Sequence, residues 1–283
     1  MSLNDNSWFT EAYNDFTAFS VRYSRKLYDE TSDFQRIEIF ETDAMGRVLI
    51  LNGCFMVTEK DTFIYHEMLV HPAMALLETP RRVVIIGGGD AGAVTELVKY
   101  SELESITLCE IDPRVVSSCR EYFPALSSGL DDPRVQVLYE DGAAFISRFQ
   151  EEFDLVLVDS TDPVGPGVAL YEMSFYQNIK KSLKKNGAAV LQTESPLFMA
   201  DVFENSVKNL RSVFGNAGAT PYLAVIPSYP GGMWSFTMCS ETVDPTKGAP
   251  RNISGNLRGD LRYYNGEVHR AAFALPEFVR RML

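Results

Sequence analysis

Residues 1–60 contain short segments in which polar and apolar side chains alternate, the pattern of half-buried β-strands. Residues 36–41 alternate in this way, a turn follows, and an apolar run covers residues 47–51. Asn52-Gly53 is a strong hairpin signal before the next apolar run. The N-terminal part is therefore predicted to form a small antiparallel sheet.

The pattern changes at Asp61, where apolar side chains recur at helical spacing as far as Leu77. Pro72 lies inside this segment and predicts a kink, because proline cannot donate the helical hydrogen bond. Strand and helix patterns then alternate. The predicted strands are 82–87, 105–110, 134–139, 153–159, 187–193, 220–226 and 234–239, and the predicted helices are 91–100, 113–122, 142–149, 172–184 and 199–213. This alternation predicts the α/β class, with a mainly parallel sheet covered on both faces.

The last segment, residues 263–283, carries aromatic and leucine side chains. We expect this tail to pack on the body of the protein. No internal repeat or low-complexity linker interrupts the chain. The change of pattern at Asp61 predicts two domains, over residues 1–60 and residues 61–283.

A glycine-rich segment stands between the first predicted strand of the large sheet and its helix. Gly87, Gly89 and Gly92 have the G-x-G-x-x-G spacing of nucleotide-binding loops. A helix N-terminus at such a loop normally attracts a phosphate, but Asp90 would repel one. Two unit charges about 4 Å apart interact by roughly 4 kcal/mol at an effective dielectric constant near 20. The loop therefore favours a nucleoside that carries an ammonium or sulfonium over a diphosphate.

Acidic side chains follow two neighbouring strands, at the edge of the sheet where open α/β folds bind ligands. Glu110 lies twenty residues after Asp90, a spacing that fits an acid accepting hydrogen bonds from ribose hydroxyls. Helix capping is the alternative for Glu110, although Asp112 before a proline suits that role better. Asp141 can accept a hydrogen bond from an adenine amino group or cap the helix that follows it, and its spacing favours neither.

The strongest signal is Asp159-Ser160-Thr161-Asp162-Pro163, directly after a buried strand. Two acids three residues apart on such a loop predict a site for an amine. The alternative is an acid-rich turn that only aids solubility, but an acid at a buried strand end costs desolvation. Tyr65 and His66 on the first long helix and Tyr229 on a Pro/Gly-rich loop suit either packing or function.

Composition narrows the class of partner. The 283 residues carry a net charge of −12, which argues against broad binding to nucleic acids or anionic membranes. Acidity also suits a cationic small molecule, although solubility alone explains it equally well. No apolar run approaches the ~18 residues of a membrane span, and the N-terminus lacks the pattern of a signal peptide.

Cysteine and histidine usage points to a reducing compartment without a metal site. Cys54, Cys109, Cys119 and Cys239 form no Cys-x-x-Cys pair and are predicted to be free thiols. The three histidines are too few and too scattered for a zinc site. We expect a cytoplasmic protein that holds no metal.

Taken together, the motifs resemble those of the spermidine synthase family, the polyamine aminopropyltransferases, and of its bacterial members above all. The residues that carry the resemblance are Phe63-Ile64-Tyr65-His66-Glu67-Met68, Gly87-Gly88-Gly89-Asp90, Glu110-Ile111-Asp112, Asp141-Gly142, Asp159-Ser160-Thr161-Asp162-Pro163 and Ile226-Pro227-Ser228-Tyr229. The resemblance implies a Rossmann-like, methyltransferase-type doubly wound sheet with a small N-terminal antiparallel β domain. It implies transfer of the aminopropyl group of decarboxylated S-adenosylmethionine to putrescine, which gives spermidine and 5′-methylthioadenosine. Decarboxylated S-adenosylmethionine is then a co-substrate, and no cofactor is expected.

The resemblance also implies a role for individual residues. The implied nucleoside site is Gln35, Glu110, Asp141, Gly142 and Pro166; the implied amine site is His66, Asp90, Asp162 and Gln192; the implied catalytic residues are Asp159 as proton acceptor with Tyr65 and Tyr229 beside the attacking nitrogen. Trp8 is a further candidate, as a cover over the amine channel. A homodimer is expected, as in the family, through exposed edges of the N-terminal sheet.

One departure and three rival functions remain. Ala91 replaces a second glycine that many relatives have after the aspartate, which is tolerated if Ala91 has helical dihedral angles. An N-methyltransferase would share the fold but needs room for the carboxylate that Asp90 repels. A nicotinamide dehydrogenase fits the glycines but not Asp90, and a non-catalytic polyamine-binding protein would need no base. The acceptor is open between putrescine, cadaverine, agmatine and longer polyamines.

Overall fold

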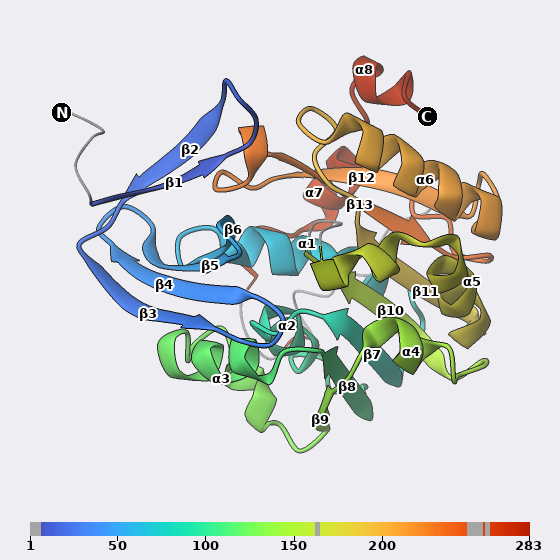
Figure 1. Cartoon of the computed structure of the whole chain (residues 1–283). Coiled ribbons are helices and arrows are strands. Elements are labelled where there is room, and N and C mark those ends of the chain that lie inside the picture. Colours follow the sequence, from blue (N-terminus) through green and yellow to red (C-terminus); the bar gives the residue numbers. More distant parts are fainter. Residues whose placement is uncertain (1–6, 162–164, 248–256, 258–260) are drawn as a thin grey trace.

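The computed structural model describes residues 7–161, 165–247, 257 and 261–283. Its N-terminal part forms two antiparallel sheets on one side of the molecule (Figure 1). One is a hairpin of β1 (Trp8–Ala12) and β2 (Ala18–Arg22). The other holds, in spatial order, β3 (Arg25–Thr31), β4 (Arg36–Thr42), β5 (Gly46–Leu51) and β6 (Cys54–Thr58). The single predicted sheet is thus two, because β2 pairs with β1 and not with β3.

The predicted turn between β5 and β6 is confirmed. Asn52 and Gly53 have φ angles of 50° and 89°, and a two-residue turn of this kind requires positive φ at both positions. Leu51 pairs with Cys54 across the turn. The Asn52 side chain also accepts a hydrogen bond from the Arg36 backbone N–H at 2.9 Å, which ties the turn to β4.

The third sheet, the large one, contains all seven predicted strands. Their bounds are β7 (Arg82–Gly87), β8 (Ser105–Glu110), β9 (Val135–Tyr139), β10 (Phe153–Asp159), β11 (Leu183–Gln192), β12 (Ala219–Val225) and β13 (Met233–Cys239). The order across the sheet is β12-β13-β11-β10-β7-β8-β9. β7 to β11 run parallel, and β13 pairs antiparallel with both β11 and β12. This is the methyltransferase-type doubly wound sheet that the sequence predicted.

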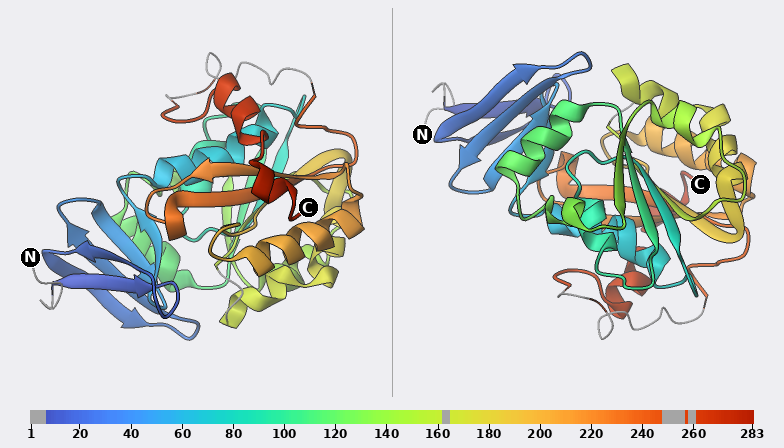
Figure 2. Two further views of the ribbon diagram at one scale, coloured as in Figure 1. Left: turned by 90° about the horizontal axis from the view of Figure 1, so that it is seen from above. Right: turned by 90° about the horizontal axis from the view of Figure 1, so that it is seen from below.

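Helices cover both faces of this sheet, as the two views of Figure 2 show. One face carries α1 (Thr62–Met74), α2 (Gly92–Leu97) and α7 (Gly266–Ala272), and the other carries α4 (Gly142–Ile146), α5 (Met173–Ser182) and α6 (Ala200–Phe214). Val83 and Ile85 of β7 pack toward α1, whereas Val84 and Ile86 pack toward α4 and α5. Every residue of β7 from 83 to 86 is therefore buried, which explains its uninterrupted apolar run.

α3 (Pro113–Tyr122) joins the two parts of the protein. Its Val115 and Cys119 share one hydrophobic cluster with Ile37 and Leu49 of the four-stranded sheet. Val116 of the same helix packs instead with the core of the large sheet. The N-terminal sheet is therefore held against the side of the molecule where β8 ends.

α1 accommodates Pro72 in its last turn. Proline has no N–H to donate to the carbonyl four residues earlier, that of Met68. The Tyr222 hydroxyl of β12 donates to that carbonyl instead, at 2.7 Å. All residues of α1 from Ile64 onward are buried, so a tertiary contact rather than water satisfies the open carbonyl.

The C-terminal tail packs on the body, as predicted. The buried Glu67 carboxylate of α1 accepts hydrogen bonds from the backbone N–H groups of Arg262, Tyr263 and Tyr264, each at 2.8 Å. α8 (Glu277–Arg280) adds Val279 to a small cluster with α6.

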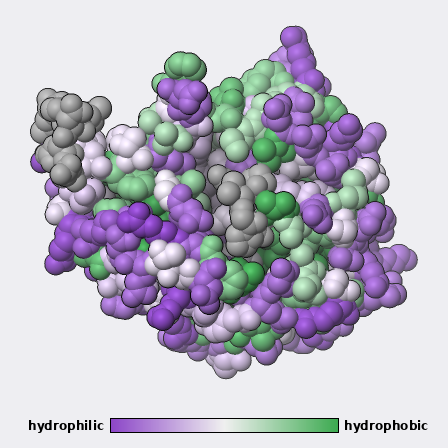
Figure 3. Space-filling view, viewed as in Figure 1, coloured by the Kyte–Doolittle hydropathy of each residue, from purple (hydrophilic) through white to green (hydrophobic). Residues whose placement is uncertain are grey.

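Among the described residues, none of the helices has the length and apolar character of a membrane span. Hydrophilic side chains cover much of the face in Figure 3, in keeping with the net charge of −12.

Candidate active site

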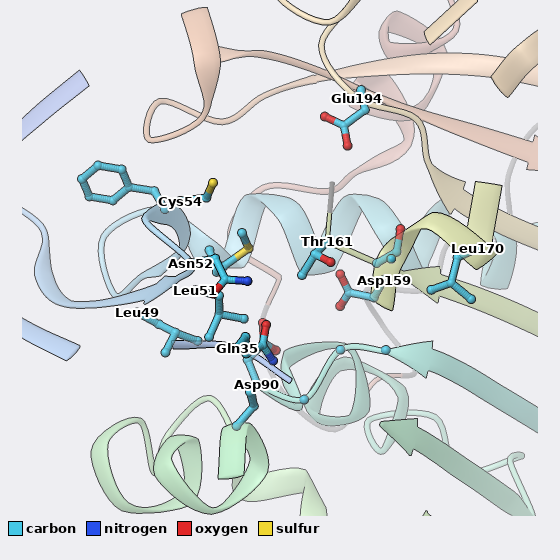
Figure 4. A pocket seen from close by; sticks show the side chains of 18 of the residues that line it. Gln35, Leu49, Leu51, Asn52, Cys54, Asp90, Asp159, Thr161, Leu170 and Glu194 are labelled. Atoms are coloured by element: carbon cyan, nitrogen blue, oxygen red, sulfur yellow. The ribbon is translucent and has the colours of Figure 1, made fainter. Parts of the chain in front are cut away.

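A cavity of about 470 Å³ lies between the N-terminal sheets and the carboxyl ends of the parallel strands. Figure 4 shows side chains from the four-stranded sheet and its turn (Gln35, Leu49, Leu51, Asn52 and Cys54) facing those at the end of the large sheet (Asp159, Thr161, Leu170 and Glu194). The volume lies within the ~300–1,000 Å³ range of small-molecule sites. The carboxyl ends of parallel strands are also where open α/β sheets bind ligands.

The glycine-rich loop lets two strand ends approach closely. Gly87 and Gly88 have φ angles of 77° and 70°, and a Cβ on Gly87 would lie 2.2 Å from the Asp159 carbonyl oxygen. Gly88 N–H donates to that same oxygen at 2.9 Å. This contact between the ends of β7 and β10 brings Asp90 into the part of the cavity that Asp159 lines.

Ala91 does not have the helical dihedral angles that would let it replace glycine without strain. Ala91 has φ 64° and ψ 16°, the left-handed conformation, and it precedes α2 as its N-cap. A left-handed residue with a Cβ is strained by about 1–2 kcal/mol, which glycine avoids. Alanine at position 91 therefore strains the loop that carries Asp90.

We expect Ala91→Gly to be less destabilising than Ala93→Gly by about 1.5–3 kcal/mol, because the first change relieves about 1–2 kcal/mol of left-handed strain and the second places glycine inside a helix at a cost of about 0.5–1 kcal/mol. Both alanines are buried, so each variant loses one buried methyl group, and Ala93 lies inside α2. Urea unfolding of the two variants measures the difference. Equal losses of stability would contradict the strain.

Asp159 and Tyr65 form the centre of the site. The Tyr65 hydroxyl on α1 donates to Asp159 Oδ1 at 2.6 Å. Asp159 Oδ2 is buried and has no hydrogen-bond partner among the described residues. Burial first, and then the charge of Asp90, raise the pKa of Asp159 to about 6. A carboxylate with an open oxygen and a raised pKa suits the acceptance of a proton.

His66 holds Asp90 from behind. Its Nε2 lies 3.2 Å from Asp90 Oδ1, at ion-pair distance but not aligned for a hydrogen bond. Burial lowers the pKa of His66, but the contact with Asp90 and the nearby charges of Asp159 and Glu96 together outweigh burial and raise it to about 9. Gly92 leaves room for the imidazole, since a Cβ there would lie 2.3 Å from His66 Cε1, and its N–H donates to Asp90 Oδ1 at 2.6 Å. His66 itself is not among the residues that line the cavity.

His66, Asp90 and Asp159 form a cluster of polar side chains. One ligand atom from each of His66, Asp90 and Asp159 lies within 4.8 Å of the others. A metal ion would need the neutral imidazole, because a protonated ring has no lone pair to offer. The raised pKa of His66 therefore fits an ammonium near the two carboxylates better than a metal ion.

The predicted nucleoside residues lie together in one half of the cavity. Gln35, Glu110, Asp141 and Gly142 all line it. Glu110 Oε1 accepts a hydrogen bond from the Asp112 backbone N–H at 2.9 Å, and burial above all raises the Glu110 pKa to about 7. The Gln35 side-chain amide donates to Asp112 Oδ2 at 3.0 Å, and this fixes the direction of the Gln35 side chain.

The capping alternatives are resolved for two acids. Asp112 is the N-cap of α3 and accepts from Arg114 N–H, as expected. Asp141 caps α4 by accepting from Ala144 N–H at 2.8 Å, and it also lines the cavity, so capping does not exclude a ligand contact. Asp162 lies outside the described residues, as does the side chain of Pro166, whose backbone belongs to the 3-10 helix η2 (Gly165–Tyr171).

Two family models match this chain in succession. The model described as the spermidine synthase tetramerisation domain matches residues 7–59, and the model of the spermine/spermidine synthase domain matches residues 62–247. The second match alone covers more than half of the chain. The chain belongs to the spermidine synthase family.

Curated relatives and solved structures of the family agree over nearly the whole length. A polyamine aminopropyltransferase of Desulforudis audaxviator is 42% identical over 272 residues, which is 96% of this chain and 97% of the relative. One of Clostridium beijerinckii is 42% identical over 98% of this chain and 97% of its own. A spermidine synthase solved in complex with the transition state analogue AdoDATO superposes with a TM-score of 0.95 at 39% identity, over 99% of this chain and 95% of that one. The spermidine synthase of Thermotoga maritima gives a TM-score of 0.92 at 39% identity, over 97% and 93%.

In this member of the spermidine synthase family, only some of the residues predicted for the amine line the cavity. Tyr229 lines the cavity, and its hydroxyl donates to the Met56 carbonyl oxygen at 2.8 Å. Gln192 does not line the cavity; its amide donates to the Tyr171 hydroxyl at 2.6 Å and to Glu194 Oε1 at 3.0 Å. Trp8 is also absent from the lining.

Glu11, Tyr13 and Glu194 are among the lining residues that were not singled out from the sequence. Glu11 and Tyr13 come from the end of β1 and the turn after it, and no motif marks them. Glu194 follows β11 by two residues, so the strand-end argument that found Glu110, Asp141 and Asp159 could have found it as well. Glu194 is buried and has a left-handed backbone, with φ 66°.

Proposed function

We propose that this enzyme transfers the aminopropyl group of decarboxylated S-adenosylmethionine to putrescine, forming spermidine and 5′-methylthioadenosine. The observation that carries the proposal is the 2.6 Å hydrogen bond from Tyr65 to Asp159, in a cavity that Asp90 also lines. The cavity thus combines acids suited to a nucleoside with acids suited to amines. The family's reaction uses both kinds of substrate, with the nucleoside as co-substrate.

In the proposed complex the nucleoside occupies the half of the cavity lined by Gln35, Glu110, Asp141 and Gly142. Pro166 is proposed as a further nucleoside contact. Glu110 accepts hydrogen bonds from the ribose hydroxyls, and Asp141 accepts one from the adenine amino group. Asp90 receives the ammonium of the aminopropyl group. Intact S-adenosylmethionine would bring a carboxylate toward Asp90, so the same acid selects the decarboxylated donor.

The chemical step is a single displacement. The neutral amine attacks the methylene carbon beside the sulfonium; the new C–N bond forms as the C–S bond breaks, and the thioether leaves uncharged. Asp159 accepts the proton of the amine, directly or through Tyr65, and Tyr229 flanks the nitrogen. The pKa of Asp159, raised to about 6 by burial above all, is closer to the pKa of an amine than the pKa of an ordinary aspartate is. Positioning of the two substrates supplies much of the remaining acceleration.

Three further residues complete the proposed amine site. Asp162 holds the diamine. His66 and Gln192 act one step away from the substrate, His66 by orienting Asp90 and Gln192 by orienting Glu194.

The reaction is tested by mass spectrometry of products from the purified protein, putrescine and either donor. We expect spermidine and methylthioadenosine from the decarboxylated donor alone. N-methylputrescine from intact S-adenosylmethionine would make the protein a methyltransferase, and absence of product with both donors across a series of diamines would refute the enzyme function.

The rate should fall as the pH is lowered from 8 to 5.5. Asp159 accepts a proton only when it is ionised, and burial raises its pKa to about 6. Glu110, whose pKa burial raises to about 7, loses one acceptor for the ribose over the same interval. The check is kcat/KM for the donor against pH, which reports groups of the free enzyme. A flat profile from pH 5.5 to 8 would contradict both assignments.

We further propose an oligomeric protein in the cytoplasm. The match of residues 7–59 to a tetramerisation domain supports an oligomer, and the dimer expected from the sequence is the alternative. Light scattering distinguishes a dimer, whose mass is twice 31.7 kDa, from a tetramer, whose mass is four times 31.7 kDa. Burial of Cys109, Cys119 and Cys239 as thiols supports a reducing compartment.

A further inference from the structure

We propose that two aromatic rings, Tyr13 and Phe198, form a wall that closes the far end of the amine half of the cavity and limits the length of the acceptor. This inference rests on the proposed function, because it concerns the amine that the enzyme accepts. It adds two specificity-determining residues that take no part in the chemical step.

The order of the strands divides the cavity into two halves about Asp159. Glu110 and Asp141 follow β8 and β9, on one side of β7 and β10. Glu194 and Trp234 belong to the segments after β11 and within β13, on the other side. A nucleoside held by the first half leaves the second half, from β10 toward β13, for the amine. We call this second half the amine half.

The two rings come from segments far apart in the sequence and meet at the amine half. Tyr13 lies in the turn between β1 and β2, and Phe198 lies between β11 and α6. Their ring centroids are 5.6 Å apart, with an interplanar angle of 66°. Both line the cavity, and Phe198 is 36% exposed. In the proposal this aromatic contact is the wall at the end of the amine half.

Backbone contacts hold both rings in place. A Cβ on Gly231, which has φ 65°, would lie 2.3 Å from Phe198 Cε2, so the ring rests directly against the glycine backbone. On the other side, Tyr13 N–H donates to the Thr17 carbonyl at 2.9 Å and closes the turn. Phe198 is therefore held through its ring, and Tyr13 through the backbone of its turn.

The wall explains a length limit through desolvation. Aromatic rings of Tyr65, Tyr229 and Trp234 line the amine half and suit a hydrocarbon chain. Glu11 and Glu194 line it as well and suit an ammonium. A longer amine would press its charged end against Tyr13 and Phe198, where water cannot solvate it. Removal of either ring opens a path to solvent and removes this penalty.

The test is the selectivity of Phe198→Ala and Tyr13→Ala for α,ω-diamines of four, five and six carbons, with decarboxylated S-adenosylmethionine as donor. We expect the ratio of kcat/KM for the six-carbon diamine to that for putrescine to rise at least tenfold in each variant. Leu197→Ala is the matched control, because Leu197 is 53% exposed on the same loop and does not line the cavity. Its ratio should stay within twofold of the original.

Phe198→Leu keeps an apolar side chain at the wall and guards against a loss of folding in the alanine variants. It should shift the ratio in the same direction by a smaller factor. A ratio that stays unchanged in folded variants active on putrescine would overturn the wall. Failure of the unaltered protein to use any diamine would instead refute the proposed function, and the wall with it.

Discussion

Asp159→Asn should lower kcat by about 10²–10⁴-fold, the usual contribution of a positioned general base. Asparagine keeps the size of the side chain and can still accept the hydrogen bond from Tyr65, but it cannot take a proton from the amine. The amine then has to lose its proton to water in a cavity that excludes much of the solvent. Steady-state turnover with saturating donor and putrescine measures the effect.

Binding of methylthioadenosine separates the loss of a base from a loss of structure. Its dissociation constant should stay within about threefold in Asp159→Asn, because the predicted nucleoside contacts come from β8 and β9. Asp131→Asn is the matched control: the side chain is 79% exposed, pairs with Arg120, and does not line the cavity. It should retain full turnover. Near-normal turnover in Asp159→Asn would refute the assignment of the base.

Asp90→Asn should weaken the binding of decarboxylated S-adenosylmethionine by about 10- to 150-fold, the equivalent of one hydrogen bond to a charged group, ~1.5–3 kcal/mol. The variant removes the negative charge that meets the ammonium and the charged partner that raises the pKa of His66. Loss of the carboxylate charge disfavours a cation at this spot. Isothermal titration of the donor in the absence of amine gives the dissociation constant directly.

Two other ligands provide the controls for this prediction. Methylthioadenosine lacks the ammonium, so its affinity should be unchanged. Intact S-adenosylmethionine should bind equally well or more tightly in Asp90→Asn, because the carboxylate it carries is no longer repelled. A variant that weakens all three ligands to the same degree would show that Asp90 supports the nucleoside half of the site rather than selecting the donor.

The positions of Glu110, Asp141 and Asp159 were predictable because the rule behind them is local. Each follows an apolar run that reads as a buried strand, and parallel strands place such ends at one edge of the sheet. The same rule applied to β11 would have found Glu194. The turn at Asn52 and Gly53 was predictable for a similar reason, since two residues with positive φ define it without distant contacts.

Other features had no local signal. The left-handed conformation of Ala91 arises because the glycine loop packs on the end of β10, and an alanine in a helix pattern does not reveal this. His66 was expected in the amine path, but the room left by Gly92 lets its ring lie behind Asp90. The separate β1–β2 hairpin, with Tyr13 in its turn, depends on pairing that alternation alone does not specify.

The sequence by itself determined the succession of strands and helices, the acidic ends of the strands, and the preference for a cationic ligand, because periodicity and residue type decide these within a few neighbours. Tertiary structure alone decided the chemistry of the site. The contact of Tyr65 with Asp159 spans 94 positions, and the raised pKa of Asp159 depends on burial and on the charge of Asp90. The meeting of Tyr13 with Phe198 likewise depends on how the hairpin lies against the large sheet. Burial and contacts between distant segments set these energies, and neither is a property of a short stretch of chain.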